Sequence, residues 1–272
     1  MTIQNLVSEI ERKQSLLCVG LDSDINKISE EFLKTSLPQY EFNKRIIDAT
    51  HEYAIAYKPN LAFYESEGIT GWMSLEFTQK YLKEKYPHIF TIADAKRGDI
   101  GNTSKHYAHT FFGRLDFDSV TLSPYMGYDV VAPFLEYEDK YVILLALTSN
   151  SSADEIQMFE SKEGLKLFEH ILTKAINWGL GDKIMFVVGA TKTEYLQQIR
   201  KIAPDNFLLI PGIGAQGGSL EDVIKYGKTD NYGLIINSSR SIIFADRSFE
   251  NFAKAASESA QKLLNEMRKF IF

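Results

Sequence analysis

Residues 94–99, with the sequence DAKRGD, combine the carboxylate and ammonium groups that acid–base chemistry requires. The residues before them, 89–93, form the apolar run IFTIA, which predicts a buried strand. Because side chains alternate along a strand, Asp94 and Lys96 should lie on the same side at its end. Asp99 should follow where the backbone has left the sheet. The spacing therefore predicts two carboxylates and a cation gathered at one strand end.

A solvated loop held by surface ion pairs is the alternative structure for such a charged segment. Two neighbouring features favour a functional site instead. One is the apolar strand that precedes the segment, and the other is the Arg97-Gly98 pair, which predicts a tight exit from the sheet.

The charges also indicate a type of reaction. If Lys58, Asp94, Lys96 and Asp99 converge in a water-poor site, the carboxylates keep each lysine as an ammonium. An ammonium is a poor Schiff-base nucleophile but a good proton donor, which favours an enzyme that protonates a developing carbanion over a lysine-imine aldolase. A carboxylate facing an anionic substrate would also destabilise the bound ground state, and loss of carbon dioxide would relieve that strain.

Eight apolar, strand-like runs alternate with helix-like segments and must position these groups. In chain order the runs are residues 16–21, 54–57, 89–93, 119–122, 142–147, 184–188, 207–210 and 233–236. The alternation predicts a parallel sheet covered by helices. Eight units in a single domain, residues 1–272, predict an α/β fold of the (β/α)8 TIM barrel class. A doubly wound open sheet is the alternative.

The structure of three further segments can be predicted. Residues 191–194, TKTE, match a capping box that opens a helix directly after the sixth strand. Residues 150–163 are polar and rich in serine, which predicts a mobile loop after the fifth strand. A C-terminal helix with an apolar stripe packed on the core is predicted from the helical spacing of Phe249, Phe252, Ala256, Leu263 and Met267.

Polar residues follow nearly every predicted strand, as expected on the catalytic face of a barrel. Residues 212–217 after strand seven also fit the dinucleotide pattern G-x-G-x-x-G. That pattern belongs in the first strand–helix unit, with an acid at the end of the next strand, and neither condition is met here. A phosphate site is predicted instead, with Gln216 and Arg240 beside the glycine backbone. A rim salt bridge is the alternative for Arg240.

The composition of the 272 residues is that of an ordinary globular protein, with 44% hydrophobic and 24% charged residues. A net charge of −6 argues against a general nucleic-acid or anionic-membrane surface. The single cysteine, Cys18, lies in an apolar run and predicts a buried structural thiol in a reducing compartment. Residues 1–13 do not resemble a secretory signal, and residues 141–147, the longest apolar run, are too short to cross a bilayer. A cytoplasmic enzyme is therefore predicted.

No metal or cofactor is predicted from the residue types. The histidines are scattered, and no carboxylate pattern completes a metal site around them. No nucleophile elbow and no Walker loop occur in the sequence.

Residues 94–103, DAKRGDIGNT, closely resemble the signature of the orotidine 5′-phosphate decarboxylase family. The ends of strands four and five, LSPYMG at 122–127 and TSN at 148–150, are similar to those of its longer bacterial subgroup (type 2). The resemblance extends from about residue 16 to residue 240. It implies a homodimeric (β/α)8 barrel that converts orotidine 5′-phosphate to uridine 5′-phosphate, the last step of de novo UMP synthesis, without cofactor or metal.

The resemblance also implies a role for each matching residue. Lys96 would protonate the carbanion at C6 of the pyrimidine, Asp94 would press against the departing carboxylate, and Lys58 would bridge the ribose and the charges. Asp99 and Thr103 would reach across the dimer interface to the ribose hydroxyls. The remaining contacts would be Asp22 and Asn60 on the ribose, Thr148 or Ser149 on the pyrimidine amide, Pro211 near the base, and Gln216, the Ser239 backbone and Arg240 on the phosphate.

Two positions limit the transfer of these roles. Many relatives have a glycine where this chain has serine before Arg240, so the phosphate contact of the Ser239 backbone is open. The choice between Thr148 and Ser149 is open too. Residues 150–163 would form the loop that closes over the pyrimidine.

Two other functions compete with this one. A sugar-phosphate decarboxylase or aldolase of the same superfamily shares D-x-K-x-x-D but uses magnesium. It needs a further acidic ligand near strand one or two, and strand two offers Lys58 instead, which would repel magnesium. A catalytically silent nucleotide-binding barrel would lack one of the charged partners, and none of them is missing.

Overall fold

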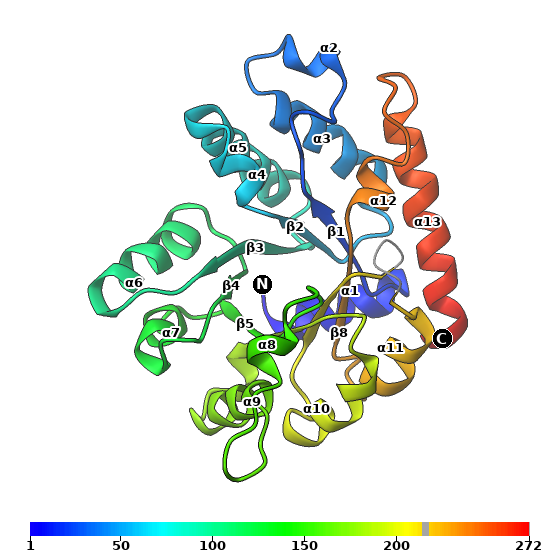
Figure 1. The fold of residues 1–272 in the computed structure, drawn as a ribbon. Helices are drawn as coiled ribbons and strands as arrows, with labels where there is room; N and C mark the ends of the chain where they lie inside the picture. The colour runs from blue at the N-terminus through cyan, green and yellow to red at the C-terminus, as the bar shows by residue number, and fades with distance from the viewer. Residues whose placement is uncertain (214–217, 272) are drawn as a thin grey trace. The chain divides into compact units, whose positions relative to one another are not determined.

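The computed structural model describes residues 1–213 and 218–271. Within them, eight parallel strands form a closed barrel in the order of the chain, with helices between successive strands (Figure 1). The strands are β1 (Leu17–Leu21), β2 (Ala56–Pro59), β3 (Phe90–Arg97), β4 (Ser119–Leu122), β5 (Tyr141–Leu147), β6 (Ile184–Val188), β7 (Leu208–Pro211) and β8 (Leu234–Ser238). The predicted (β/α)8 class is confirmed.

Helices precede β1, connect the strands and follow β8. The longer helices are α1 (Ile3–Lys13), α3 (Pro38–Thr50), α5 (Gly68–Lys85), α6 (Gly101–Ala108), α7 (Tyr128–Leu135), α9 (Leu167–Asn177), α10 (Leu196–Ile202), α11 (Leu220–Gly227) and α13 (Phe252–Ile271). The short ones are α2 (Glu30–Leu33), α4 (Ala62–Glu65), α8 (Asp154–Gln157), α12 (Arg240–Ile243), the π-helix η1 (His109–Arg114) and the 3-10 turns η2 (Gly181–Lys183) and η3 (Thr193–Tyr195).

The chain divides into two compact units. Unit 1 contains Met1–Ala95, Phe111–Asp118 and Ser238–Phe272, and unit 2 contains Lys96–Thr110 and Ser119–Asn237. The assignment of the whole chain to one domain remains a prediction.

Helix α3 of unit 1 packs against both α5 and α13 (Figure 1). Phe42 of α3 stacks on Phe252 of α13 with ring centroids 5.4 Å apart. The predicted C-terminal helix is confirmed, with two corrections to its stripe. Phe249 precedes the helix, and Leu264 rather than Leu263 is buried. Leu264 is buried because the buried positions of α13 follow one another at steps of three and four residues from Phe252, and Leu263 does not fall on this face.

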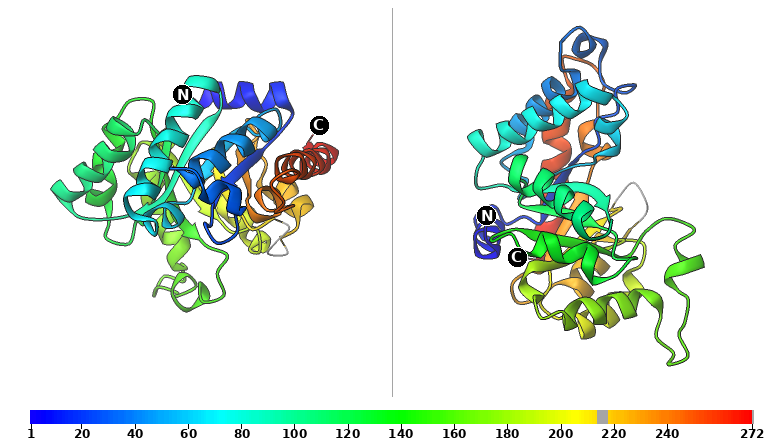
Figure 2. Two further views of the ribbon diagram at one scale, coloured as in Figure 1. Left: turned by 90° about the horizontal axis from the view of Figure 1, so that it is seen from above. Right: turned by 90° about the vertical axis from the view of Figure 1, so that its left-hand side faces the viewer.

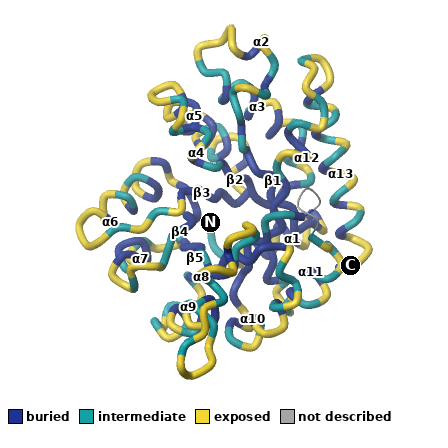
Figure 3. Tube along the Cα trace, in the orientation of Figure 1, coloured by how far each residue is buried: buried dark blue, intermediate teal, exposed yellow. Residues whose placement is uncertain are grey.

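In unit 2, β5 pairs with β4 on one side and with β6 on the other. The strand is apolar throughout and nearly all of it is buried, whereas the outer sides of the surrounding helices are exposed (Figure 3). The predicted loop 150–163 is only partly irregular, because it contains α8 and because an isolated antiparallel bridge joins Glu160 to Lys166. Figure 2 shows the segment between α8 and α9 projecting from the rest of unit 2.

Only β4 and β6 have the predicted bounds among the described strands, and the others differ by one to four residues at one or both ends. Two of the wrong predictions bear on the local structure. Strand β3 continues to Arg97 instead of ending at residue 93, because the charged residues that follow the apolar run remain in the sheet. The capping box at 191–194 does not open a helix. A 3-10 turn, η3, occupies Thr193–Tyr195 without a side-chain cap, and α10 begins only at Leu196.

Candidate functional site

Lys58 and Asp94 form a buried ion pair in unit 1. The Lys58 ammonium donates a hydrogen bond of 2.8 Å to Asp94 Oδ2, and the two residues are 4% and 8% exposed. Burial opposes a charge on Lys58, but the carboxylates of Asp94 and Asp22 outweigh it and raise the pKa of the lysine above its usual value. Lys58 is therefore a fixed ammonium in neutral solution, which agrees with the predicted charge state.

Backbone pairing fixes the two strand ends that carry this pair. An isolated parallel bridge joins Asn60 to Asp94, and the Leu61 N–H donates to the Asp94 carbonyl at 3.2 Å. The chain after β2 thus stays alongside β3 up to the carboxylate. Lys58 itself lies opposite Gly20 of β1. Because glycine has no side chain, Gly20 does not compete with Lys58 for space.

The end of β1 is held by a tyrosine from the next connection. Tyr64 donates from its hydroxyl to the Leu21 carbonyl at 3.0 Å and accepts from Asn43 Nδ2 at 2.9 Å. Asp22 follows directly and is half-buried. Its Oδ1 atom is buried and has no hydrogen-bond partner within residues 1–213 and 218–271. Since buried acceptors are nearly always satisfied, this oxygen is a candidate contact for a ligand.

Lys96 in unit 2 has an unusual backbone. Its φ is +48°, a left-handed conformation that costs a residue with a side chain about 1 kcal/mol or more. The Lys96 N–H donates to Thr121 Oγ1 of β4 at 2.9 Å. Because Lys96 departs from extended geometry, the alternation rule does not set the direction of its side chain. The residue is exposed, so the expected water-poor surroundings are not found for Lys96 in the chain by itself.

Gly98 lies against the exit of β4. The Ser123 N–H donates to the Arg97 carbonyl at 2.7 Å, and a Cβ atom on Gly98 would lie 2.8 Å from the Ser123 carbonyl oxygen. The chain therefore leaves the sheet tightly at 97–98, as predicted. The role of Gly98 in this exit is to leave space for the close approach to Ser123. The positive φ of this turn belongs to Lys96.

Asp99 and Thr103 lie on either side of the start of α6. The Ile100 N–H donates to Asp99 Oδ1 at 2.7 Å, and Asp99 is half-buried while Thr103 is exposed. Helix α6 is fixed to α7 by Ser104, whose hydroxyl donates to the Val130 carbonyl at 2.6 Å. The structure thus places Asp99 and Thr103 on one segment that leaves β3.

Thr148 and Ser149 follow β5, and α8 folds back on the first of them. The Thr148 N–H donates to Gln157 Oε1 at 2.8 Å, and Gln157 Nε2 donates to Thr148 Oγ1 at 2.7 Å. The Thr148 hydroxyl in turn donates to Asn150 Oδ1 at 2.6 Å. Ser149 packs against the end of β6, where a Cβ on Gly189 would lie 2.7 Å from the Ser149 backbone nitrogen. Residues 148–157 therefore form a loop closed at its base.

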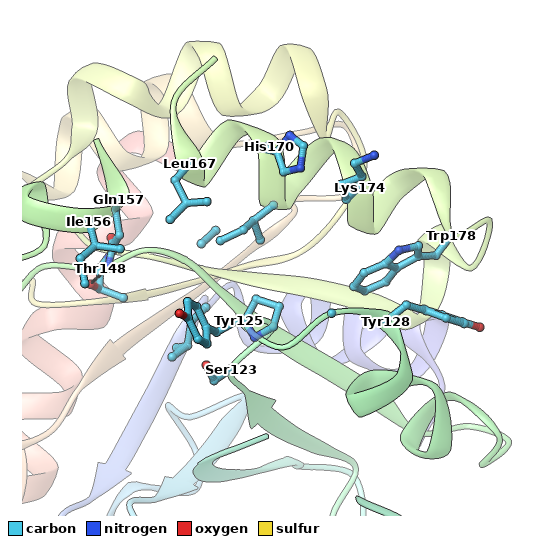
Figure 4. Close-up of a pocket in the computed structure, with 15 residues that line it drawn as sticks. Ser123, Tyr125, Tyr128, Thr148, Ile156, Gln157, Leu167, His170, Lys174 and Trp178 are labelled. Atoms are coloured by element: carbon cyan, nitrogen blue, oxygen red, sulfur yellow. Dashed lines mark hydrogen bonds between the residues drawn. The ribbon is translucent and has the colours of Figure 1, made fainter. Parts of the chain in front are cut away.

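A groove of about 500 Å³ runs along this loop in unit 2. Figure 4 shows Thr148, Ile156 and Gln157 at one end of it and the rings of Tyr128 and Trp178 at the other. The centroids of these two rings are 5.1 Å apart. The groove is mainly apolar and open, since Tyr125 on its wall is 85% exposed.

The predicted phosphate contacts are only partly within the described residues. Gln216 lies outside them. Pro211 closes β7 in register with Asn237 of β8, both in unit 2. In unit 1, Ser239 donates from its hydroxyl to the Gly20 carbonyl at 3.1 Å, and the exposed Arg240 opens α12.

The structure thus brings together Lys58, Asp94, Asn60 and Asp22 in unit 1, and ties Lys96 to β4 in unit 2. Three residues escaped the sequence reasoning: Thr121, Gln157 and Asn237. Thr121 and Gln157 hold predicted site residues, and Asn237 has a buried Oδ1 atom without a hydrogen-bond partner in the described part of the chain. Only Asn237 carried a signal, because it is a polar residue at the end of an apolar strand.

No group of three or more His, Cys, Asp or Glu side chains suited to a metal ion occurs within residues 1–213 and 218–271. Among the described helices, none combines the length and the apolar composition that crossing a bilayer requires. Cys18 is buried, and burial raises the pKa of its thiol to about 12, which agrees with the predicted structural thiol.

Comparison with known proteins identifies the family. The profile of the orotidine 5′-phosphate decarboxylase / HUMPS family matches residues 15–255. The chain belongs to this family. It is 58% identical over 271 residues to orotidine 5′-phosphate decarboxylase of Phocaeicola vulgatus, covering 100% of this chain and 99% of the relative. The corresponding enzyme of Bacteroides fragilis is 57% identical over 267 residues, covering 98% and 97%.

Solved structures of the family have the same fold. The structure titled OMP decarboxylase from Leishmania donovani aligns with a TM-score of 0.83 and 35% identity, covering 99% of this chain and 100% of that one. A structure from Toxoplasma gondii, titled as a putative orotidine-monophosphate decarboxylase, aligns with a TM-score of 0.87 and 32% identity, covering 99% and 97%. The family resemblance seen in residues 94–103 is therefore confirmed over nearly the whole chain.

Proposed function

We propose that the chain decarboxylates orotidine 5′-phosphate to uridine 5′-phosphate and carbon dioxide, the last step of de novo UMP synthesis. The observation that carries the proposal is the family's DAKRGD signature at the end of β3, with its first carboxylate paired to the buried ammonium of Lys58. Full-length relatives at 53–58% identity are named for this activity, which favours it over the magnesium-dependent members of the superfamily.

In the proposed mechanism, Lys96 protonates C6 as carbon dioxide leaves. Asp94 faces the substrate carboxylate, where its charge disfavours the ground state. Lys58 neutralises part of that charge and contacts the ribose. The ammonium of Lys96 stabilises the developing carbanion and then transfers its proton to it, so no acid from solvent is needed.

The base and ribose contacts come from the other strand ends. Asp22 offers a buried oxygen to the ribose, together with Asn60. Thr148 already uses its N–H and hydroxyl on Gln157 and Asn150, which favours Ser149 as the residue that contacts the pyrimidine amide. Pro211 would pack near the base.

The phosphate would be held after β7 and β8. Arg240 supplies the cation, with Gln216 and the Ser239 backbone as further donors. Because the phosphate does not react, these residues contribute mainly to binding.

A homodimer is part of the proposal, with Asp99 and Thr103 donated to the partner's site. Its support is the exposure of four large apolar side chains on the segments that follow β3 and β4 in unit 2, Ile100, Tyr125, Met126 and Tyr128. Large apolar side chains left exposed in number are typical of a protein interface. A partner subunit and the bound substrate would also remove water from the exposed Lys96. We further propose that the enzyme acts in the cytoplasm.

A direct assay tests the function. The purified protein is mixed with orotidine 5′-phosphate, and the pyrimidine absorbance is followed with and without a chelator. Turnover that is insensitive to the chelator is expected. Turnover lost on chelation would point to a metal-dependent enzyme, and binding without turnover would point to a silent nucleotide-binding barrel.

Mixing two inactive variants tests the shared site. Lys96→Ala and Asp99→Ala each damage every site of their own homodimer, but a mixed dimer contains one site with both residues intact. Random exchange should therefore restore activity to about one quarter of the sites. A mixture that stays inactive after proven subunit exchange would contradict the cross-subunit role of Asp99.

A further inference from the structure

We infer that Thr121 is a positioning residue for Lys96. Its hydroxyl holds the lysine backbone in the left-handed conformation from which the ammonium reaches the substrate carbon. This inference rests on the proposed function, in which Lys96 is the proton donor.

The first step concerns the backbone of Lys96. A residue inside a strand normally donates its N–H to a carbonyl of the neighbouring strand. Lys96 has a φ of +48°, and its N–H donates to the Thr121 side chain at 2.9 Å. A left-handed residue that carries a side chain persists only where the surroundings hold it. The hydroxyl of Thr121 is a contact of this kind.

The second step concerns the rigidity of the acceptor. Thr121 is fully buried in β4, and it pairs in register with Ile143 of β5. Its β-branched side chain has restricted rotamers, so the position of Oγ1 is set by the sheet. The lysine backbone is therefore attached to a part of unit 2 that cannot easily adjust.

The third step concerns the residues that follow Lys96. The Arg97 carbonyl accepts from the Ser123 N–H at 2.7 Å, and Gly98 packs against the Ser123 carbonyl oxygen. The turn from Lys96 to Gly98 is thus fastened to the exit of β4 at three points. The contacts of Arg97 and Gly98 are made by the backbone of Ser123, directly after β4. The contact of Lys96 is made by a side chain and can be removed by substitution.

The consequence for the reaction is geometric. A proton donor must approach its acceptor carbon closely, and a displacement of 1 Å can cost about 100-fold in rate. Loss of the Thr121 hydroxyl leaves the phosphate, ribose and base contacts in place. It should therefore lower kcat and leave KM nearly unchanged.

The experiment compares Thr121→Val with Thr121→Ser. Valine keeps the shape and removes the acceptor, so kcat should fall by about 10- to 100-fold with KM within about threefold of wild type. Serine keeps the acceptor and should restore kcat to within about threefold. The affinity for uridine 5′-phosphate should be the same in all three proteins.

Thr91→Val is the matched control. Thr91 is also a fully buried strand threonine, and its hydroxyl bonds to Asp118 and Gln79, at the opposite end of β3 from Lys96. This variant should lose stability and keep the wild-type kcat. If Thr121→Val does not fold, Thr121→Cys replaces it, because the thiol is only a weak acceptor and should still lower kcat.

Three results would overturn the inference. One is a Thr121→Val or Thr121→Cys enzyme with wild-type kcat, another is a serine variant as slow as the valine variant, and the third is a KM that rises as much as kcat falls. An inactive wild-type protein would instead refute the proposed function, so the two failures are distinguishable.

Discussion

Two lysines of the proposed site are held by different means. Lys58 in unit 1 is buried and fixed by charge, through its ion pair with Asp94 and the field of Asp22. Lys96 in unit 2 is exposed and fixed through its backbone, by a left-handed conformation and a hydrogen bond to Thr121. The lysine that keeps its proton is embedded in the fold. Lys96, the proposed proton donor, is attached to the fold through its backbone, and the residue is exposed.

The largest effect should come from Lys96→Ala. It removes the proposed proton donor, so kcat should fall by about 10⁴-fold or more while the affinity for uridine 5′-phosphate changes little. The stability should stay near that of the wild type, because Lys96 is exposed. Steady-state assays, calorimetric titration and urea unfolding measure the three quantities. Near-normal turnover would remove Lys96 from its role.

Lys58→Met tests the buried lysine, which is fixed by its ion pair with Asp94. It leaves the Asp94 carboxylate buried without its ion-pair partner, so the protein should lose about 3 kcal/mol of unfolding free energy as well as its activity. Urea unfolding at neutral pH checks this expectation. Asp94→Asn combined with Lys58→Met is the control, because removing both charges should recover part of the stability. A single variant as stable as the wild type would mean that the pair does not fix this strand end.

Gly98→Ala tests the fastening of the Lys96 turn to β4. The new Cβ would lie 2.8 Å from the Ser123 carbonyl oxygen, which is closer than real contacts allow. The turn must therefore shift, and kcat should fall by about tenfold or more. Gly101→Ala is a useful contrast, since it has open space around it and tests only the strain of a positive φ. Equal kcat values for the wild type and Gly98→Ala would contradict the close packing.

The smallest effect concerns the titration of Lys58. Its pKa is raised on folding, so its contribution to stability is complete below the ordinary lysine value of 10.5 and declines as the pH rises toward the folded value. The unfolded chain then releases a proton that the folded chain retains. The wild type should therefore lose about 0.4 kcal/mol relative to Lys58→Met between about pH 9 and pH 10.5. Urea unfolding of both proteins across this range measures the difference, and a wild type that gained stability would reverse the assigned shift.

Much of the fold was predictable, because buried parallel strands are continuous apolar runs. Strands β4 and β6 have the predicted bounds, and all of their residues are apolar except the hydroxyl-bearing Ser119 and Thr121 of β4. The boundary of β3 was not predictable in this way. Its last residues include charged ones, and they are held by tertiary contacts, the Asn60–Asp94 bridge and the hydrogen bond from Lys96 to Thr121. The capping-box prediction at 191–194 failed for a related reason. A local motif opens a helix only where the surrounding chain can begin a helix at that residue, and here it forms a 3-10 turn.

The candidate site was predictable where residue type determines it. Lys58 and Asp94 were recognised as charges at strand ends, and they form a pair. The left-handed φ of Lys96 had no signal, since nothing in the residue type of a lysine favours it. Thr121 and Gln157 were missed for another reason. Their contacts join positions 25 and 9 residues apart, and such pairing depends on the tertiary arrangement.

The two hydrogen bonds between Thr148 and Gln157 have a practical consequence for protein engineering. They hold the base of the loop closed without help from the exposed side chains between its two ends. Ser151, Ser152, Glu155 and Ile156 can accordingly be varied as a set, with the Thr148–Gln157 pair, the buried Ala153 and the Asp154–Lys192 ion pair retained. Libraries built at these four positions would change the surface of the loop and leave its closed base intact.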